Sequence, residues 1–232
     1  MIRRADRIVC TSPVYAKGSE ALSNVQGKVS VVPIGVEPVK TDEEGAARIK
    51  NRFEGKKIVY SLGRLVGYKG YQYLVEAASF LTDDYVVVIG GEGPLREELE
   101  KQIADLNLQE KVKLIGRVAD EDFEAWYGAC SLFCLSSIWK TEAFAIVQIE
   151  AMSCGKPVVA TKIKGSGVSW VNEDGVSGIN VEPEDPKALA EAIMEVCGEG
   201  YESYCAGARE RYKTMFTRKG MIDNCLKLYE TL

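Results

Sequence analysis

The chain has 232 residues, 46% hydrophobic and 27% charged, which is enough apolar material for a sizeable core. Its formal charge of -5 argues against non-specific nucleic-acid binding, which depends on clustered lysine and arginine side chains. Histidine is absent, which excludes Ser-His-Asp and Cys-His catalysis, H-E-x-x-H chemistry and most zinc sites within this chain.

Cysteine usage and hydropathy indicate a compartment. The seven cysteines are scattered and include no C-x-x-C pair, as expected for small core residues in a reducing environment. The first residues are charged rather than arranged as a signal peptide, and no apolar run is long enough to span a bilayer. We therefore expect a soluble, cytoplasmic protein.

Short apolar, β-branched runs alternate with helix-period segments along most of the chain. Most of these runs are continuously hydrophobic, which is typical of strands covered on both faces. The alternation predicts an α/β fold with an open, doubly wound parallel sheet, Rossmann-like, that binds ligands beyond the carboxyl ends of its strands. Predicted strands lie at residues 8–10, 29–32, 58–60, 85–89, 112–115, 132–135, 157–160 and 179–181, and predicted helices at 43–53, 71–80, 94–106, 120–127, 145–153 and 186–196.

Both ends of the chain depart from the strand and helix repeat. Residues 1–40 contain two short predicted strands, a helix and a turn-rich connection, whereas residues 41–199 carry the regular repeat. Residues 200–232 show only helical patterns, with a break at 217–220, and the charges at 209–211 are typical of a solvated face. We predict a core domain at 41–199, flanked by segments that belong with a neighbouring unit.

Residues 61–70 follow a predicted strand, precede a predicted helix and combine glycines with cations. Gly63 and Gly67 allow close approach to the backbone, and Arg64 and Lys69 supply two positive charges for a phosphate pair. The stretch is not a P-loop, because G-x-x-x-x-G-K-[ST] is not matched. The alternative is an ordinary glycine turn with exposed cations.

Two further loops follow predicted strands. Residues 90–94 do not match a dinucleotide-binding G-x-G-x-x-G, because Arg96 stands where the third glycine belongs. A tight turn with Pro94 as the first residue of a helix is favoured instead. The D-E-D at residues 120–122 is similar to the metal-binding D-x-D of some glycosyltransferases. An N-cap at Asp120 with acids in the first turn is favoured, and no metal is predicted there.

Residues 141–161 place two carboxylates around a predicted helix start near Ala145. Glu142 precedes the helix, whose unpaired N–H groups and partial positive charge suit a diphosphate. Glu150 lies about 7.5 Å further along the helix axis, comparable to the distance of a ribose from its own diphosphate. The alternative is that Glu142 is a first-turn acid stabilised by the helix dipole and that Glu150 is a solvated residue.

These loops together resemble the donor half of the retaining, family-four glycosyltransferases of the GT-B fold. The resemblance covers nearly the whole chain and includes A-D-R-I-V-C-T-S, V-V-P-I-G-V-E-P, S-L-G-R-L with a following K-G, G-G-E-G-P-L-R-E-E-L and V-K-L-I-G-R-V. Its most specific element is the E-x7-E pair of Glu142 and Glu150, followed by G-K-P-V-V. The resemblance implies a nucleotide-diphosphate sugar as donor, with UDP or GDP as its nucleotide, and no metal or cofactor.

The resemblance also implies a role for each matching position. Arg64 and Lys69 would bind the donor diphosphate and stabilise the leaving group, and Glu142 would approach hydroxyls of the sugar. Glu150 would hold the ribose, and backbone near Val118 would meet the base. The implied donor-binding positions are Gly63, Val118, Phe144, Ala145, Ile146, Val147 and Glu150, and the implied catalytic positions are Arg64, Lys69 and Glu142.

The sequence departs from the family pattern in three respects. Ala145 stands where the family usually has glycine, and Ser169-Trp170 stands where it usually has Pro-Glu. Family members also carry an N-terminal acceptor domain, of which residues 1–40 would be a remnant or linker, while residues 200–232 would pack back on it. We therefore expect the chain by itself, through its donor-binding domain at residues 41–199, to bind a nucleotide sugar without transferring the sugar. Any peripheral membrane contact would come through the missing half.

Three functions remain open at this point. The first is a donor half of a transferase that acts on a saccharide or lipid-linked acceptor. The second is a sugar-nucleotide epimerase of the same architecture, which would need no acceptor. The third is a non-catalytic, nucleotide-sugar-binding subunit that docks on a separate acceptor subunit, and an NAD-binding domain is disfavoured by the missing third glycine.

Overall fold

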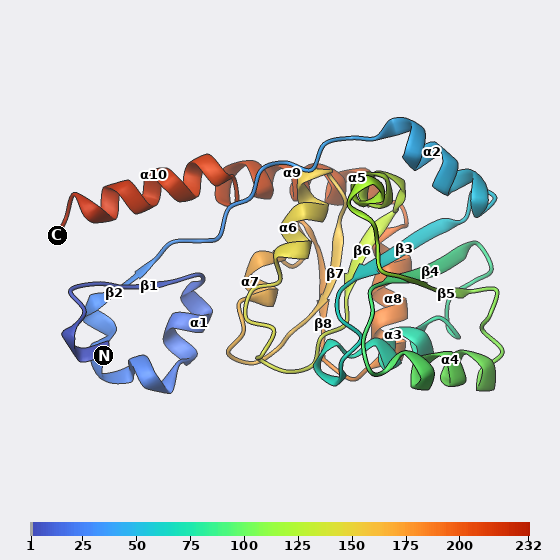
Figure 1. The fold of residues 1–232 in the computed structure, drawn as a ribbon, viewed down its shortest axis with the longest axis horizontal. Helices are drawn as coiled ribbons and strands as arrows, with labels where there is room; N and C mark the ends of the chain where they lie inside the picture. The colour runs from blue at the N-terminus through green and yellow to red at the C-terminus, as the bar shows by residue number, and fades with distance from the viewer. Residues whose placement is uncertain (1) are drawn as a thin grey trace.

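A six-stranded parallel sheet forms the centre of the computed structural model, which describes residues 2–232 (Figure 1). The strand order is β5-β4-β3-β6-β7-β8, and all five strand pairs are parallel. The predicted α/β, doubly wound, Rossmann-like sheet is thereby confirmed. The strands are β3 (Lys57–Leu62), β4 (Tyr85–Gly90), β5 (Val112–Gly116), β6 (Leu132–Leu135), β7 (Val158–Thr161) and β8 (Gly178–Val181).

Successive residues of each strand alternate between two cores, one on each face of the sheet. In β3 and β4, Tyr60 and Val86 belong to the first core, and Val59 and Val87 to the second. Burial on both faces explains why the strands are continuously hydrophobic in sequence. The first core packs on α2 (Glu43–Arg52), α5 (Asp120–Ala129), α6 (Ile146–Ser153), α7 (Val168–Val171) and α9 (Tyr201–Met215), and the second on α3 (Tyr71–Ala77), α4 (Arg96–Asp105) and α8 (Pro186–Val196).

The order of the strands reverses between β3 and β6, which are neighbours in the sheet although β4 and β5 lie between them in sequence. Connections on the two sides of this point leave in opposite directions, an arrangement in which doubly wound folds bind ligands at the carboxyl ends of the strands. The loop after β3 and the loop after β6 therefore meet. These are the loops that carry Arg64, Lys69 and Glu142.

The predicted start of one helix and the predicted N-cap of another are wrong. Pro94 lies in a turn, and α4 begins only at Arg96, because Leu95 N–H donates to Leu65 O (3.1 Å) and ties this turn to the loop after β3. Ala119 occupies the N-cap of α5, so Asp120 is the first helical residue and not the cap. Asp120 and the two following acids do form the first turn, where the helix dipole favours negative charge.

The N-terminal segment forms a small unit of its own beside the main sheet (Figure 1). Two parallel strands pair there in a separate sheet, and Cys10, Ala16 and Leu22 form its core. An extended segment then leads to α2, and Val36 on it pairs with the C-terminal region through Phe216 O (2.9 Å). The elements of this unit are η1 (Ile2–Arg4), β1 (Ile8–Cys10), α1 (Pro13–Gly18), η2 (Glu20–Lys28) and β2 (Val29–Val31).

The two C-terminal helices behave differently. Helix α9 packs on α6 and buries Ala208, Tyr212 and Phe216 in the first core. A helix break is present, but it lies at Phe216 and Thr217 and not at the predicted 217–220. The Thr217 side chain caps α10 (Arg218–Tyr229), so residues 218–220 are helical. Helix α10 extends from the main domain along the N-terminal sheet (Figure 1). None of the helices among residues 2–232 combines the length and hydrophobicity needed to cross a bilayer.

Candidate functional site

An ion pair joins the two loops at the reversal of strand order. Lys69 Nζ lies 2.5 Å from Glu142 Oε2, and each side chain is only 11% exposed. The same oxygen of Glu142 accepts a hydrogen bond from Ser137 Oγ (3.0 Å). The sequence places these residues in separate loops, and the structure brings them into direct contact. A nearly buried cation and carboxylate at the carboxyl ends of the strands are candidates for binding a polar ligand.

Glycines allow the loop after β3 to pack closely around Lys69 and against the loop after β6. Gly70 has φ 65°, and a Cβ atom there would lie 2.1 Å from Ser136 O. A Cβ on Gly63 would lie 2.9 Å from the Tyr71 hydroxyl and 3.3 Å from Lys69 Nζ. Any larger residue at either position would displace the loop or the ammonium group. The predicted importance of Gly63 therefore has a steric basis beside Lys69.

Arg64, the second predicted cation, is exposed. It forms no ion pair with any of residues 2–232, in contrast to Lys69. Its neighbour Leu65 is fully buried, which anchors the loop on which the guanidinium group is carried. Arg64 thus has a charge available for an external anion, whereas Lys69 already has an internal partner.

Helix α6 begins with a backbone conformation that is rare for alanine. Ala145 occupies the N-cap with φ 61° and ψ 80°, in the left-handed region that glycine adopts without strain. No side chain within the described residues caps the helix, and Ile146 is 41% exposed at its first position. Gln148 N–H donates to Ala145 O (3.1 Å), whereas the N–H groups of Ile146 and Val147 have no acceptor within the described residues and are available to an anion near Glu142.

Glu150 lies further along α6 and is partly buried. Its Oε2 accepts a hydrogen bond from the Tyr127 hydroxyl on α5 (2.8 Å). Burial raises the pKa of the Glu150 carboxyl, and the bond from Tyr127 opposes that shift. Glu150 is thus not the solvated residue of the alternative interpretation. It is a partly desolvated hydrogen-bond acceptor.

Phe144 and Val118 contribute mainly packing. The Phe144 ring is buried and lies 6.4 Å from the Trp170 ring and 6.0 Å from the Phe216 ring, measured between centroids. Its side chain therefore belongs to the core, which leaves its backbone for any ligand contact. Val118 is partly buried against Gly90, where a Cβ would lie 2.8 Å from Val118 Cγ2. Val147 is also partly buried, in the first turn of α6.

Several residues that support the site had no motif to reveal them. Ser136 Oγ donates to Lys69 O (3.0 Å), and Ser166 Oγ donates to Glu142 O. The only sequence signal for Ser136 and Ser137 was their position directly after a predicted strand. Ser166 comes from the loop after β7 and Tyr127 from α5, so their contacts depend on the assembled fold.

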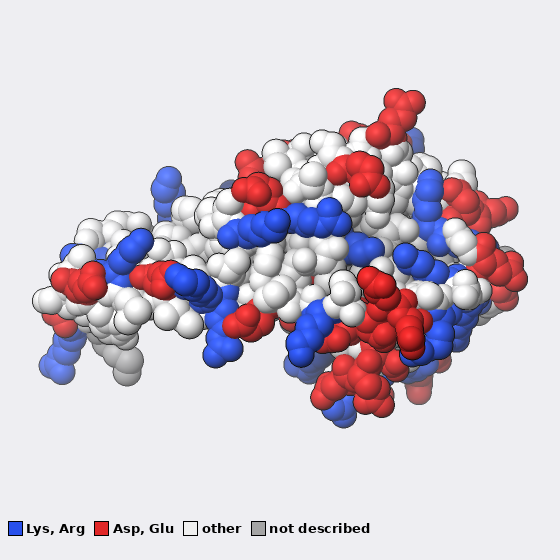
Figure 2. Space-filling view, turned by 90° about the horizontal axis from the view of Figure 1, so that it is seen from above, with Lys and Arg blue, Asp and Glu red and all other residues white. Residues whose placement is uncertain are grey.

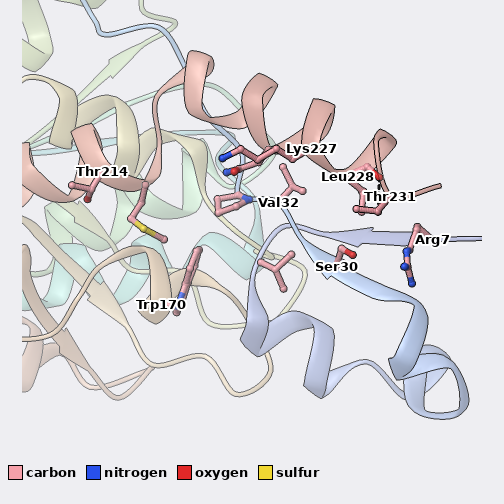
Figure 3. A pocket seen from close by; sticks show the side chains of 12 residues that line it. Arg7, Ser30, Val32, Trp170, Thr214, Lys227, Leu228 and Thr231 are labelled. Carbon is pink, nitrogen blue, oxygen red and sulfur yellow. Dashed lines mark hydrogen bonds between the residues drawn. The ribbon is translucent and has the colours of Figure 1, made fainter.

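A cavity of about 630 Å³ lies away from this site, between α10, β2 and Trp170 (Figure 3). Its walls contain none of the predicted site residues. A second cavity of about 400 Å³ has Lys140 and Thr141 on one wall, directly before Glu142, and Tyr15 and Gly18 on the other. No group of three metal-ligating side chains gathers within residues 2–232. On the face shown in Figure 2, basic side chains are interspersed with acidic ones.

Residues 42–212 match the family described as Glycosyl transferases group 1. The chain belongs to this family, and its fold is that of the GT-B glycosyltransferases. The match includes every predicted site residue, because Gly63 to Glu150 lie inside it.

Among individual proteins, the chain is 33% identical over 231 residues to O-antigen chain mannosyltransferase C of Escherichia coli, covering 98% of this chain and 61% of that one. It is 32% identical to D-rhamnosyltransferase WbpZ of Pseudomonas aeruginosa, covering 93% of this chain and 57% of that one. The chain thus spans about 60% of the length of these curated relatives.

Solved structures share the fold at lower identity. HepE of Anabaena, crystallised with UDP and glucose, superposes with a TM-score of 0.87 at 23% identity, over 99% of this chain and 64% of that one. Sucrose-phosphate synthase of Thermosynechococcus elongatus gives a TM-score of 0.82 at 24% identity, over 98% of this chain and 58% of that one.

Proposed function

We propose that this chain is the donor-binding half of a retaining, metal-independent glycosyltransferase. Its donor is a UDP- or GDP-sugar, from which a hexose passes to a saccharide or lipid-linked acceptor. The observation that carries the proposal is the Lys69–Glu142 pair at the reversal of strand order, beside the uncapped start of α6. Support also comes from HepE, whose crystals contain UDP and glucose, and from relatives named as mannosyl- and rhamnosyltransferases.

The chemistry of such a donor matches the groups present. Departure of a nucleoside diphosphate requires stabilisation of negative charge, which Arg64, Lys69 and the α6 N-terminus supply together. Glu142 accepts hydrogen bonds from sugar hydroxyls, and Glu150 from those of the ribose. Donor binding replaces part of the contact between Lys69 and Glu142 by contacts to diphosphate and sugar. The relatives named above are transferases, which favours transfer over epimerisation.

The proposal extends to the division of labour in the whole protein. The relatives are longer than this chain, and the acceptor groups would come from the portion that this chain does not match. The chain alone would therefore bind the donor without transferring its sugar. Any contact with a membrane surface, and with a lipid-linked acceptor there, would belong to that other portion.

Calorimetric titration of the chain with UDP, GDP, UDP-glucose and GDP-mannose tests the proposal. We expect at least one nucleotide and its sugar conjugate to bind with a dissociation constant below about 1 mM, which corresponds to a standard binding free energy of about -4 kcal/mol. Arg64→Ala should weaken binding of the nucleotide diphosphate. Lys213 is an exposed cation on α9, and Lys213→Ala is the matched control. If none of the four compounds binds with a dissociation constant below about 1 mM, the proposed donor site in this chain is refuted.

A further inference from the structure

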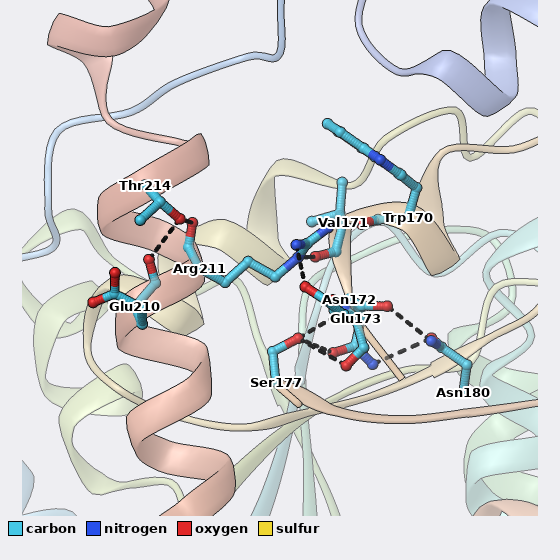
Figure 4. Close-up of polar contacts among 9 residues, drawn as sticks. All are labelled: Trp170, Val171, Asn172, Glu173, Ser177, Asn180, Glu210, Arg211 and Thr214. Carbon is cyan, nitrogen blue, oxygen red and sulfur yellow. Dashed lines mark hydrogen bonds and ion pairs between the residues drawn. The ribbon is translucent and has the colours of Figure 1, made fainter. Parts of the chain in front are cut away.

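The side chain of Arg211 turns from α9 toward α7 instead of into solvent (Figure 4). Its guanidinium Nε donates to Val171 O (2.7 Å), and Nη2 donates to Trp170 O. Nη1 pairs with the Glu173 carboxylate, and the side chain is only 13% exposed. The sequence-based assignment of residues 209–211 to a solvated face is therefore wrong for Arg211, because α7 packs against this part of α9.

Arg211 satisfies the end of a helix that cannot be stable by itself. Helix α7 has only four residues, and Trp170 and Val171 carry its last carbonyl groups, which have no partner further along the helix. The planar guanidinium group serves both carbonyls and the Glu173 carboxylate from three separate nitrogens, whereas an ammonium group offers its donors from a single atom. Its Cζ also lies 5.7 Å from the centroids of the Trp170 and Phe216 rings.

The opposite end of α7 contacts the segment that carries Glu142. Gly167 N–H donates to Ala143 O (2.8 Å), and Ser166 Oγ donates to Glu142 O. The buried Gln148 side chain of α6 donates to Val168 O (3.4 Å) and so adds a tie between α7 and α6. Arg211 thus clamps one end of a short element whose other end holds the backbone of Glu142 and Ala143.

The Lys69 backbone and the Glu150 side chain have supports outside α7. Lys69 N–H donates to Val66 O (3.0 Å), and Ser136 Oγ of the loop after β6 donates to Lys69 O, while Lys69 Nζ pairs with Glu142. Glu150 is held by Tyr127 of α5. A disturbance of α7 therefore reaches Glu142 directly and Lys69 only through their ion pair, and it leaves the supports of the Lys69 backbone and of Glu150 in place.

We propose that Arg211 is a positioning residue for the donor sugar: through α7 it fixes the backbone at Glu142 and Ala143, so that the Glu142 carboxylate faces the sugar hydroxyls. This inference rests on the proposed donor site. Arg211 itself touches neither Lys69 nor Glu142, and its effect is confined to the part of the donor that Glu142 contacts.

The test compares each nucleotide diphosphate with its sugar conjugate by calorimetry, using UDP, UDP-glucose, GDP and GDP-mannose. In Arg211→Met, which keeps an apolar stem, we expect about tenfold weaker binding of the sugar nucleotide and less than about twofold change for the diphosphate. Arg211→Lys should show the same selective loss and provides a milder variant if Arg211→Met does not fold. Lys213→Met on the same helix is the control, with no expected change.

Coupling between the two ends of α7 makes the test sharper. Ser166→Ala removes the bond to Glu142 O and should produce the same selective loss. If α7 transmits the effect, the double variant of Arg211→Met and Ser166→Ala should lose little more than either single variant. Full additivity would contradict transmission through α7.

Two results would overturn the inference and can be told apart. Equal weakening of diphosphate and sugar nucleotide, or a lower melting temperature with an unchanged ratio of the two affinities, would make Arg211 merely structural. Failure of the unsubstituted chain to bind any of the four compounds would instead refute the proposed donor site, and the inference would fall with it.

Discussion

Lys69 and Glu142 lie 73 positions apart in the sequence and form a 2.5 Å ion pair in which neither side chain is more than 11% exposed. Burying such a pair costs desolvation free energy, and removal of one partner leaves the other charge uncompensated. The pair is therefore a weak reason for stability by itself and a strong constraint on substitution. Its position at the reversal of strand order is one reason why we propose that it contacts the donor.

We first predict the effect of breaking this pair on stability. Lys69→Met or Glu142→Leu alone should lower the free energy of unfolding by about 3 kcal/mol, whereas the double variant should recover most of that loss. Urea denaturation measures all three values. Asp223→Asn, which breaks the exposed pair with Lys219 on α10, is the control and should cost less than about 0.5 kcal/mol. Single losses below about 1 kcal/mol would show that water reaches the pair.

A second prediction separates the two glutamates by ligand. Glu150→Ala should weaken binding of the nucleotide diphosphate itself, because Glu150 is proposed to hold the ribose. Glu142→Ala should chiefly remove the extra affinity of the sugar nucleotide over the diphosphate. Titration of both variants with UDP or GDP and the matching sugar nucleotide measures each effect. Equal losses for both ligands in both variants would contradict this division.

The third prediction concerns pH. Burial raises the pKa of Glu150 above its ordinary 4.5, so the folded state holds its proton to higher pH than the unfolded state does. Stability contributed by this group is thus present below pH 4.5 and is lost as pH rises through the folded-state pKa. Glu150→Gln should raise the melting temperature at pH 7, and the gain should shrink or vanish at pH 4. A gain that is equal at both values would contradict the raised pKa.

The fourth prediction concerns the start of α6. Ala145 has φ 61°, a conformation that costs alanine about 1–2 kcal/mol and glycine almost nothing. Ala145→Gly should therefore increase the free energy of unfolding by about 0.5–1 kcal/mol after allowance for the greater freedom of glycine in the unfolded chain. The control, Ala151→Gly, lies inside the same helix and should destabilise by about 1 kcal/mol. Destabilisation by both substitutions would show that Ala145 is not strained.

Local pattern was sufficient for the elements and for most of the candidate site. Continuous apolar runs marked the strands because a parallel sheet is buried on both faces. The rule that such sheets bind ligands at their strand ends, together with the resemblance to the glycosyltransferase family, selected Arg64, Lys69, Glu142 and Glu150. These residues lie in the loops and the helix that the rule indicates, although the roles assigned to them remain predictions.

Local pattern was insufficient wherever a contact joins distant segments. Pro94 could not show that its turn would be tied to Leu65, and Asp120 carried the composition of a cap although Ala119 occupies that position. Arg211 has the composition of a surface residue, and only the packing of α9 against α7 makes it a buried clamp.

By itself the sequence determined the succession of strands and helices along the chain, and the charged and glycine-rich loops that follow the strands. Only the tertiary structure decided that Lys69 and Glu142 form a pair, that Tyr127 holds Glu150, and that Arg211 reaches α7. The reason is physical: periodicity and turn chemistry act over a few neighbouring residues, whereas a buried polar group takes whichever partner the assembled fold brings within hydrogen-bond distance.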